Sequence, residues 1–171
     1  MSSELRFKCR HCDQTHVGIP DLGFDAPYHY AQLNESEQAD AELTSDLCTI
    51  EDDHFIRGVL QIPIIDHEPE YFGLGVWVSL SAQNFARYQE LFDCPDPDEP
   101  PYFGWFCNRI SGYPDTLNLK AKVILQPHPN RPKIELQPTD HPLSVQHHNG
   151  ISVDDMMELL HAHGAFDSCD E

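Results

Sequence analysis

The stretch His54-Phe55-Ile56-Arg57-Gly58-Val59-Leu60-Gln61-Ile62-Pro63-Ile64 decides the fold that we expect for this chain. Its large aliphatic side chains recur on one side of an extended backbone, whereas Arg57 and Gln61 fall on the other side. This period of two is typical of a half-buried strand. A turn follows at 66–70, and a second alternating segment then places its apolar residues on one side: Leu74, Val76, Val78 and Leu80. The two segments predict an antiparallel pair of strands over one core.

The segments on either side of this pair indicate further strands and a few helices. A helix is expected over residues 82–92 behind an N-cap at Ser81, and another after Ser152, where apolar residues follow at helical spacing. A short exposed helix is expected within 34–46. Further strands are expected at 102–107, 117–125 and 134–136, and the acidic, proline-rich run 93–101 is an exposed link. We therefore expect an α+β fold: a predominantly antiparallel β-sheet with two or three helices on one face and an N-terminal zinc knuckle.

The 171 residues are expected to form a single domain, with an N-terminal arm at 1–20 and the sheet and helices at 46–165. The first residues lack a signal-peptide pattern and no apolar run reaches spanning length, so a cytoplasmic location is expected. In that compartment the six cysteines should be reduced thiols or metal ligands rather than disulfides.

The formal charge is −19, from 29 acidic against 10 basic residues. Such a surface repels phosphate backbones and anionic lipids, so neither nucleic acid nor a membrane is expected as a partner. A basic protein would be attracted. The simpler interpretation is that the acidic residues only keep the protein soluble.

The first candidate site is a metal centre built on Cys9-Arg10-His11-Cys12-Asp13-Gln14-Thr15-His16. Zinc favours thiolate and imidazole ligands, and four of them close a structural site. Cys9, Cys12 and His16 are within reach of one another, and Cys48 is the expected fourth ligand, with His11 and His54 as substitutes. The alternative is that the two cysteines are ordinary thiols. A redox pair is disfavoured, because no amphipathic helix follows the second cysteine.

The second candidate is a ligand face on the polar side of the central strands, with Arg57, Trp77 and Ser79 projecting together beside Gln61. An arginine beside an aromatic ring suits an anionic ligand. The alternative is that solvent or a loop covers this face. No catalytic residue is assigned, because no nucleophile-elbow motif is present. His147 and His148 are expected to be exposed.

A resemblance to a known family rests on blocks that occur in order along most of the chain. They are Cys9-x-x-Cys12-x-x-x-His16, Asp46-Leu47-Cys48-Thr49-Ile50, His54-Phe55-Ile56-Arg57-Gly58, Gly75-Val76-Trp77-Val78-Ser79-Leu80-Ser81, Pro101-Tyr102-Phe103-Gly104-Trp105, Asp115-Thr116-Leu117-Asn118-Leu119-Lys120 and Thr139-Asp140-His141-Pro142-Leu143. The chain resembles the bacterial family catalogued as domain of unknown function 2199. This resemblance implies a single-domain bacterial protein with no assigned activity, whose pattern includes the four expected zinc ligands. Asp13 departs from the glycine usual there, which weakens the knuckle slightly.

Three functions follow as expectations. The first is a zinc-binding, non-enzymatic structural or interaction module. The second is a metal-dependent enzyme in which water replaces His16 or Cys48 as a ligand. The third is an acidic, immunity-type inhibitor of a basic partner, which rests on charge alone. The number of protein ligands on the metal distinguishes the first from the second.

Overall fold

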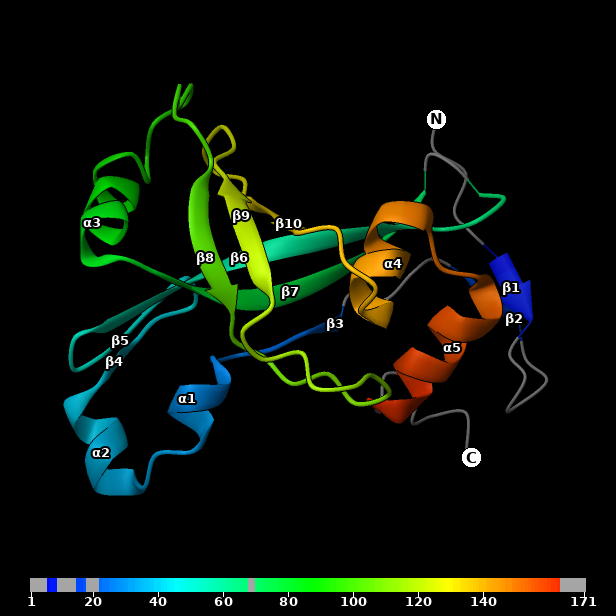
Figure 1. Cartoon of the computed structure of the whole chain (residues 1–171), viewed down its shortest axis with the longest axis horizontal. Coiled ribbons are helices and arrows are strands. Elements are labelled where there is room, and N and C mark those ends of the chain that lie inside the picture. Colours follow the sequence, from blue (N-terminus) through cyan, green and yellow to red (C-terminus); the bar gives the residue numbers. More distant parts are fainter. Residues whose placement is uncertain (1–5, 9–14, 18–21, 68–69, 164–171) are drawn as a thin grey trace.

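The computed structural model describes residues 6–8, 15–17, 22–67 and 70–163, and a long β-ribbon lies at its centre (Figure 1). The ribbon consists of β6 (Asp53–Pro63) and β7 (Tyr71–Leu80), which pair antiparallel from His54 opposite Leu80 to Pro63 opposite Tyr71. The predicted alternation is confirmed: the aliphatic residues that were predicted to share one side are buried, whereas Arg57 and Gln61 are only half-buried.

Three more strands close this ribbon into a barrel. They are β8 (Tyr102–Phe106), β9 (Lys120–Ile124) and β10 (Lys133–Leu136). Each pairs antiparallel with the strand before it, and β10 returns to pair with β6. In a five-stranded meander the first and last strands run in the same direction, so this closing pair is parallel. The α+β class is confirmed, and the sheet, which was predicted to be predominantly antiparallel, is mixed because this closing pair is parallel.

Short strands extend the sheet beyond the barrel. β3 (Leu22–Gly23) pairs parallel with β7. β5 (Leu47–Ile50) pairs antiparallel with β6, and β4 (Glu42–Leu43) pairs antiparallel with β5. At the N-terminus, β1 (Arg6–Lys8) and β2 (Thr15–Val17) form a separate antiparallel pair.

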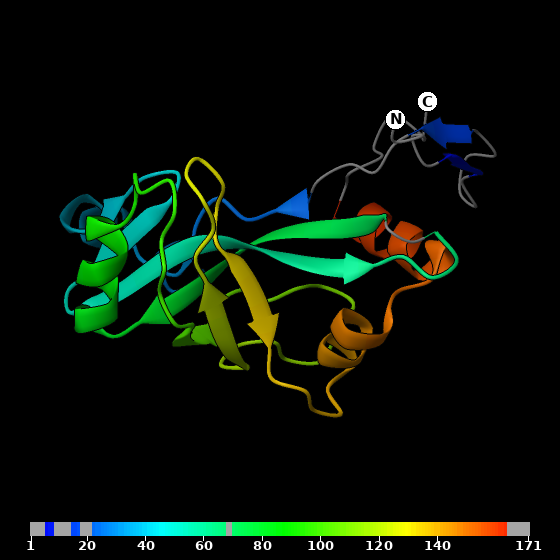
Figure 2. The same cartoon turned by 90° about the horizontal axis from the view of Figure 1, so that it is seen from above.

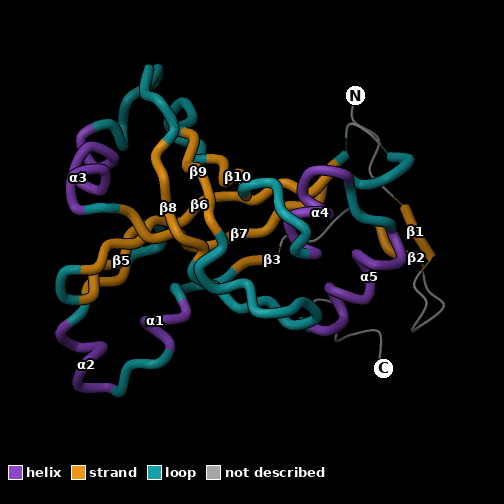
Figure 3. Tube along the Cα trace, viewed as in Figure 1, coloured by secondary structure: helices purple, strands orange, loops and turns teal. Residues whose placement is uncertain are grey.

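Five helices are present in the described part of the chain, and Figure 3 shows them interleaved with the strands. α1 (Tyr28–Ala31) and α2 (Glu35–Asp40) precede β4, and α3 (Ala82–Glu90) follows β7. α4 (Pro142–Asn149) and α5 (Val153–Ala162) follow β10. Figures 1 and 2 place α2 and α3 toward one end of the long axis and α4 and α5 at the other, rather than together on one face. None of the described helices has the length and apolar character needed to cross a bilayer.

The helix starts follow from local capping. The predicted caps are confirmed, because Ser81 accepts a hydrogen bond from the backbone of Asn84 and Ser152 accepts one from the backbone of Asp155. α2 begins with a capping box between Asn34 and Glu37. The predicted helix over 82–92 ends earlier, at Glu90.

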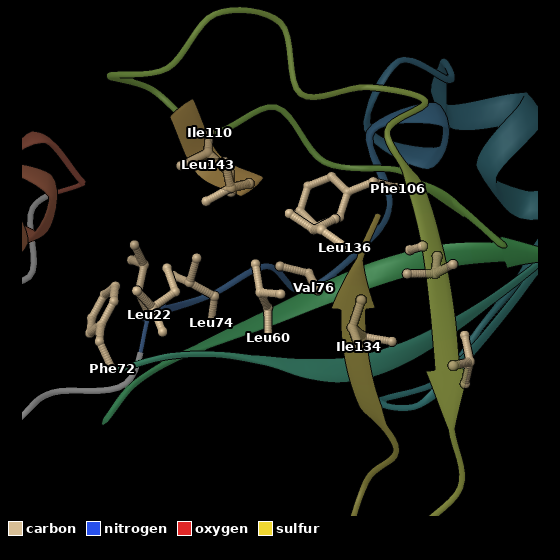
Figure 4. Close-up of a cluster of buried hydrophobic side chains, with 14 of the residues drawn as sticks. Leu22, Leu60, Phe72, Leu74, Val76, Phe106, Ile110, Ile134, Leu136 and Leu143 are labelled. Atoms are coloured by element: carbon tan, nitrogen blue, oxygen red, sulfur yellow. The ribbon is translucent and has the colours of Figure 1, made fainter. Parts of the chain in front are cut away.

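Apolar side chains pack on both faces of the β6–β7 ribbon. The larger cluster fills the barrel and extends to α4 and α5, as Figure 4 shows for Leu60, Leu74, Ile134 and Leu143. The smaller cluster lies on the opposite face. It contains the buried side chains of Cys48, Phe55, Trp77 and Cys107.

Candidate functional site

Of the predicted metal ligands near the N-terminus, His16 falls in the β1–β2 pair. Phe7 lies opposite His16 and Lys8 opposite Thr15 in its register, so residues 9–14 join the two strands. Cys9 and Cys12 fall in this joining segment and lie outside the described residues, and only the backbone of His16 is described. The register therefore brings the backbone of His16 to the strand that immediately precedes Cys9.

Cys48, the expected fourth ligand, is buried on β5. Its side chain is 1% exposed and belongs to the small apolar cluster with Phe55, Trp77 and Cys107. Desolvation in this cluster raises the pKa of Cys48 to about 11, so the group is a neutral thiol at pH 7. Figures 1 and 2 show β5 and the β1–β2 pair at opposite ends of the long axis.

The two substitute ligands are placed differently. His11 lies outside the described residues. The ring of His54 stacks on Phe85 with centroids 4.6 Å apart, and its Nδ1 lies 3.4 Å from the hydroxyl of Thr49. Within the residues whose side chains are described, no group of three or more histidine, cysteine, aspartate or glutamate side chains could hold a metal ion.

The predicted ligand face brings Arg57 and Trp77 together as direct cross-strand partners. Trp77 is fully buried, because the chain around Phe24 covers it: the indole Nε1 donates to the carbonyl oxygen of Phe24 at 2.8 Å. Asn108, itself buried, accepts from the backbone N–H of Trp77 at 2.7 Å and donates to Ala26 at 3.1 Å. At Trp77 a loop therefore covers this face.

Arg57 lies over two glycines on the same face. A Cβ atom placed on Gly23 would approach Nη2 of Arg57 to 2.9 Å, and one on Gly75 would approach it to 3.4 Å. The buried Nε of Arg57 has no hydrogen-bond partner, and no carboxylate pairs with this guanidinium in the described ranges. Ser79 is half-buried and pairs with Trp105 on β8.

A histidine pair that was expected to be merely exposed connects α4 to the barrel. Nδ1 of His147 lies 2.8 Å from the carbonyl oxygen of Gln61 on β6, and Nε2 of His148 lies 2.7 Å from that of Leu136 on β10. Because a carbonyl oxygen only accepts, each of these nitrogens carries a proton. His148 is exposed and His147 half-buried, and both line a cavity of about 510 Å³ together with Glu135. Desolvation lowers the pKa of His147.

The aromatic strand β8 divides its side chains between two environments. Tyr102 and Phe106 are buried in the barrel, whereas Phe103 and Trp105 point outward and are 50% and 41% exposed. A strand was predicted here, and it has one buried and one exposed face.

Comparison with known proteins identifies one family. The family model described as "Uncharacterized protein conserved in bacteria (DUF2199)" matches residues 8–151, which is most of the chain. The match includes the segment with Cys9, Cys12 and His16 and ends after α4. No curated protein and no solved structure matches the chain.

Proposed function

The chain belongs to the DUF2199 family of uncharacterised bacterial proteins, and we propose that it is a zinc-binding protein whose N-terminal hairpin holds the metal. The observation that supports this proposal is the register of β1 and β2, which joins the strands through the segment that contains Cys9 and Cys12. Two thiols separated by two residues, followed by an imidazole, form a donor set that zinc favours.

We propose Cys9, Cys12 and His16 as the ligands that the hairpin supplies. Cys48 was expected to be the fourth ligand, and it is the member of the set that the fold supports least. It is a buried neutral thiol on β5, at the other end of the long axis from the hairpin. To bind zinc there, this thiol would have to lose its proton and leave the apolar cluster in which it is buried.

The role that we propose for the metal is structural, and the protein is then an interaction module rather than an enzyme. A short two-stranded pair is marginal in water by itself, because it buries little apolar surface. Metal binding would supply the free energy that orders it. The acidic surface would meet a basic partner.

The zinc content of purified protein tests this proposal. Wild-type chain prepared without chelators is expected to carry about one zinc ion, measured by mass spectrometry of the metal. Cys9→Ser and Cys12→Ser should lose it, whereas Cys94→Ser, which changes a half-buried thiol in a loop, should retain it. Wild-type protein that holds no zinc after purification and after dialysis against zinc would refute the proposal.

The second candidate function, a metal-dependent enzyme, is favoured by the position of Cys48. If this thiol stays in its cluster, three named donors remain and a fourth coordination position is open to water. X-ray absorption decides between the two: four protein ligands support the structural module, and three with one oxygen ligand support the enzyme. Cys48→Ser that retains zinc would remove Cys48 from the ligand set.

A further inference from the structure

The outward surface of β8 and β9 combines aromatic rings with lysines. Phe103 and Trp105 meet edge to face, with ring centroids 5.0 Å apart. In the antiparallel register Phe103 lies opposite Lys122 and Trp105 opposite Lys120. Directly opposed residues share one face of a sheet, so the two rings and the two lysines project from the same surface. These four residues are called the aromatic–lysine face below.

The lysines of this region are not neutralised, although the chain carries an excess of acids. Lys120, Lys122 and Lys133 are the three lysines whose side chains the structure describes, and all are exposed on β9 and β10. None of them forms an ion pair within the described ranges. By contrast, Arg87 and Arg131 each have a carboxylate within 3.1 Å. An unpaired cluster of cations in a chain with a formal charge of −19 is a local exception to the overall charge.

A hollow beside these side chains provides room for a ligand. It has a volume of about 270 Å³, and its lining includes Phe103, Lys120, Lys122, Glu135 and Gln137. Two residues along a strand are about 6.7 Å apart, so the two ammonium groups of β9 can approach one anionic group together. Glu135 lies opposite Lys122 but forms no ion pair with it.

We propose that the aromatic–lysine face binds a nucleotide. The base would lie against Phe103 and Trp105, since aromatic side chains on a sheet stack with bases of any sequence. The phosphate would lie between Lys120 and Lys122, which attract it as point charges. The nucleotide is either free or part of a single strand, because both present the same base and phosphate.

This proposal departs from the expectation that nucleic acid is excluded as a partner. That expectation averaged the charge over the whole chain. At physiological salt the Debye length is about 8 Å, so acids farther away than this are largely screened. The local pairing of rings and unneutralised lysines then decides what this face attracts.

The two tryptophans of the chain provide an intrinsic probe, because Trp77 is fully buried whereas Trp105 is 41% exposed. Adenosine monophosphate should quench the emission of Trp105 in a saturable manner. Trp105→Phe, which leaves only Trp77, should abolish the response. Wild-type emission that is unchanged by the nucleotide, or that falls without saturating, would overturn the proposal.

Charge variants distinguish a local site from general attraction. Lys122→Gln should weaken binding about tenfold, as the loss of one charge-assisted contact to phosphate predicts. Lys133→Gln is the matched control, since it removes the same charge from a neighbouring strand but does not line this hollow. Equal weakening by both variants would contradict a site at Lys120 and Lys122.

The source of the nucleotide is distinguished by repeating the titration with an oligomer of ten deoxyadenylates. Tighter binding of the oligomer than of the mononucleotide, with the same sensitivity to Lys122→Gln, identifies a single strand as the ligand. Equal affinity per nucleotide identifies the free nucleotide. Oligomer binding that Lys122→Gln leaves unchanged counts against the proposed site.

Discussion

Gly104 is a residue of β8 that has no room for a side chain, because β7 lies close beside it. A Cβ atom there would lie 2.7 Å from the backbone oxygen of Ser79 and would also overlap the side chain of Val78. Gly23 is a useful contrast, because its Cβ would meet only the far end of the Arg57 side chain, at 2.9 Å. A backbone atom cannot move aside as a guanidinium can, so a side chain should be tolerated at Gly23 but not at Gly104.

Gly104→Ala should therefore lower the free energy of unfolding by about 1–3 kcal/mol, the usual cost of overpacking. Gly23→Ala is the control and should change it by no more than about 0.5 kcal/mol, as for an exposed position. Urea denaturation of both variants measures the difference. Equal stabilities for the two variants would show that β8 can move away from β7.

Sequence reasoning at this scale succeeded where the determinants are local. Ser81 and Ser152 were predicted as helix caps because a cap bonds to a backbone N–H three residues away. His147 and His148 could not be assigned in this way. Their partners are carbonyl groups on β6 and β10, and His147 lies 86 positions from the residue it contacts.

α4 is a helix that sequence patterns did not predict. Only Leu143 and Ser144 of this helix are buried, so it shows no apolar stripe. It begins at Pro142, and His141 is its N-cap: Nδ1 of His141 accepts a hydrogen bond from the backbone N–H of Leu143. The helix is held against the barrel by its buried residues and by the contacts of His147 and His148. Both depend on tertiary structure, which a local sequence pattern does not record.

The stability of the contact between α4 and the barrel should depend on pH through His147. Burial lowers the pKa of this imidazole from its ordinary 6.5, so the unfolded chain binds the proton more readily than the folded one. The contribution of His147 is thus complete above pH 6.5 and is lost as the pH falls below that value. His147→Gln should make the decrease in stability between about pH 7 and pH 5 smaller than in wild type.

Urea denaturation at a series of pH values checks this expectation. Val145→Ala is the matched control, because it changes an exposed position on the same helix without removing a titrating group. The control should keep the pH dependence of the wild type. A pH dependence that His147→Gln leaves unchanged would assign the decrease to other groups.

The five strands of the barrel were predictable, but their closure was not. Alternation along residues 54–64 and 73–80 identified the two long strands because side-chain burial follows directly from period two. Closing the barrel depends on how far five strands twist and tilt, and no residue pattern in a single strand records this. The parallel pairs β10–β6 and β3–β7 were missed for the same reason.

At the scale of the whole molecule, the excess of acids dominates the electrostatics. A formal charge of −19 makes the folded chain repel itself, since folding brings the carboxylates closer together. Added sodium chloride should therefore raise the melting temperature, by about 2–4 °C for each kcal/mol of repulsion that is screened.

Melting curves between low and moderate salt, at fixed pH, measure this effect. Chloride is preferred to sulfate, because sulfate also strengthens apolar burial and would confuse the interpretation. An equal osmolality of sorbitol serves as the uncharged control. A melting temperature that stays constant or falls with chloride would show that local ion pairs outweigh the general repulsion.

The overall class was predictable from the order of the elements, because strands outnumber helices and short links join most of them. The zinc site remains a prediction, since Cys9 and Cys12 lie outside the described residues. Its weakest member was Cys48, which sequence spacing placed near the other ligands without any information on which end of the sheet β5 occupies.

The barrel closes where β10 pairs with β6, and this seam consists of two residue pairs, Lys133 with Val59 and Ile134 with Leu60. The strands of the β6–β7 ribbon, in contrast, are paired along nearly their entire length. Local opening of the barrel should therefore begin at this seam or at the β7–β8 pair, which also has two residue pairs, while the β6–β7 ribbon stays paired. Deuterium would then enter the amides at one of these two pairings well before those between β6 and β7.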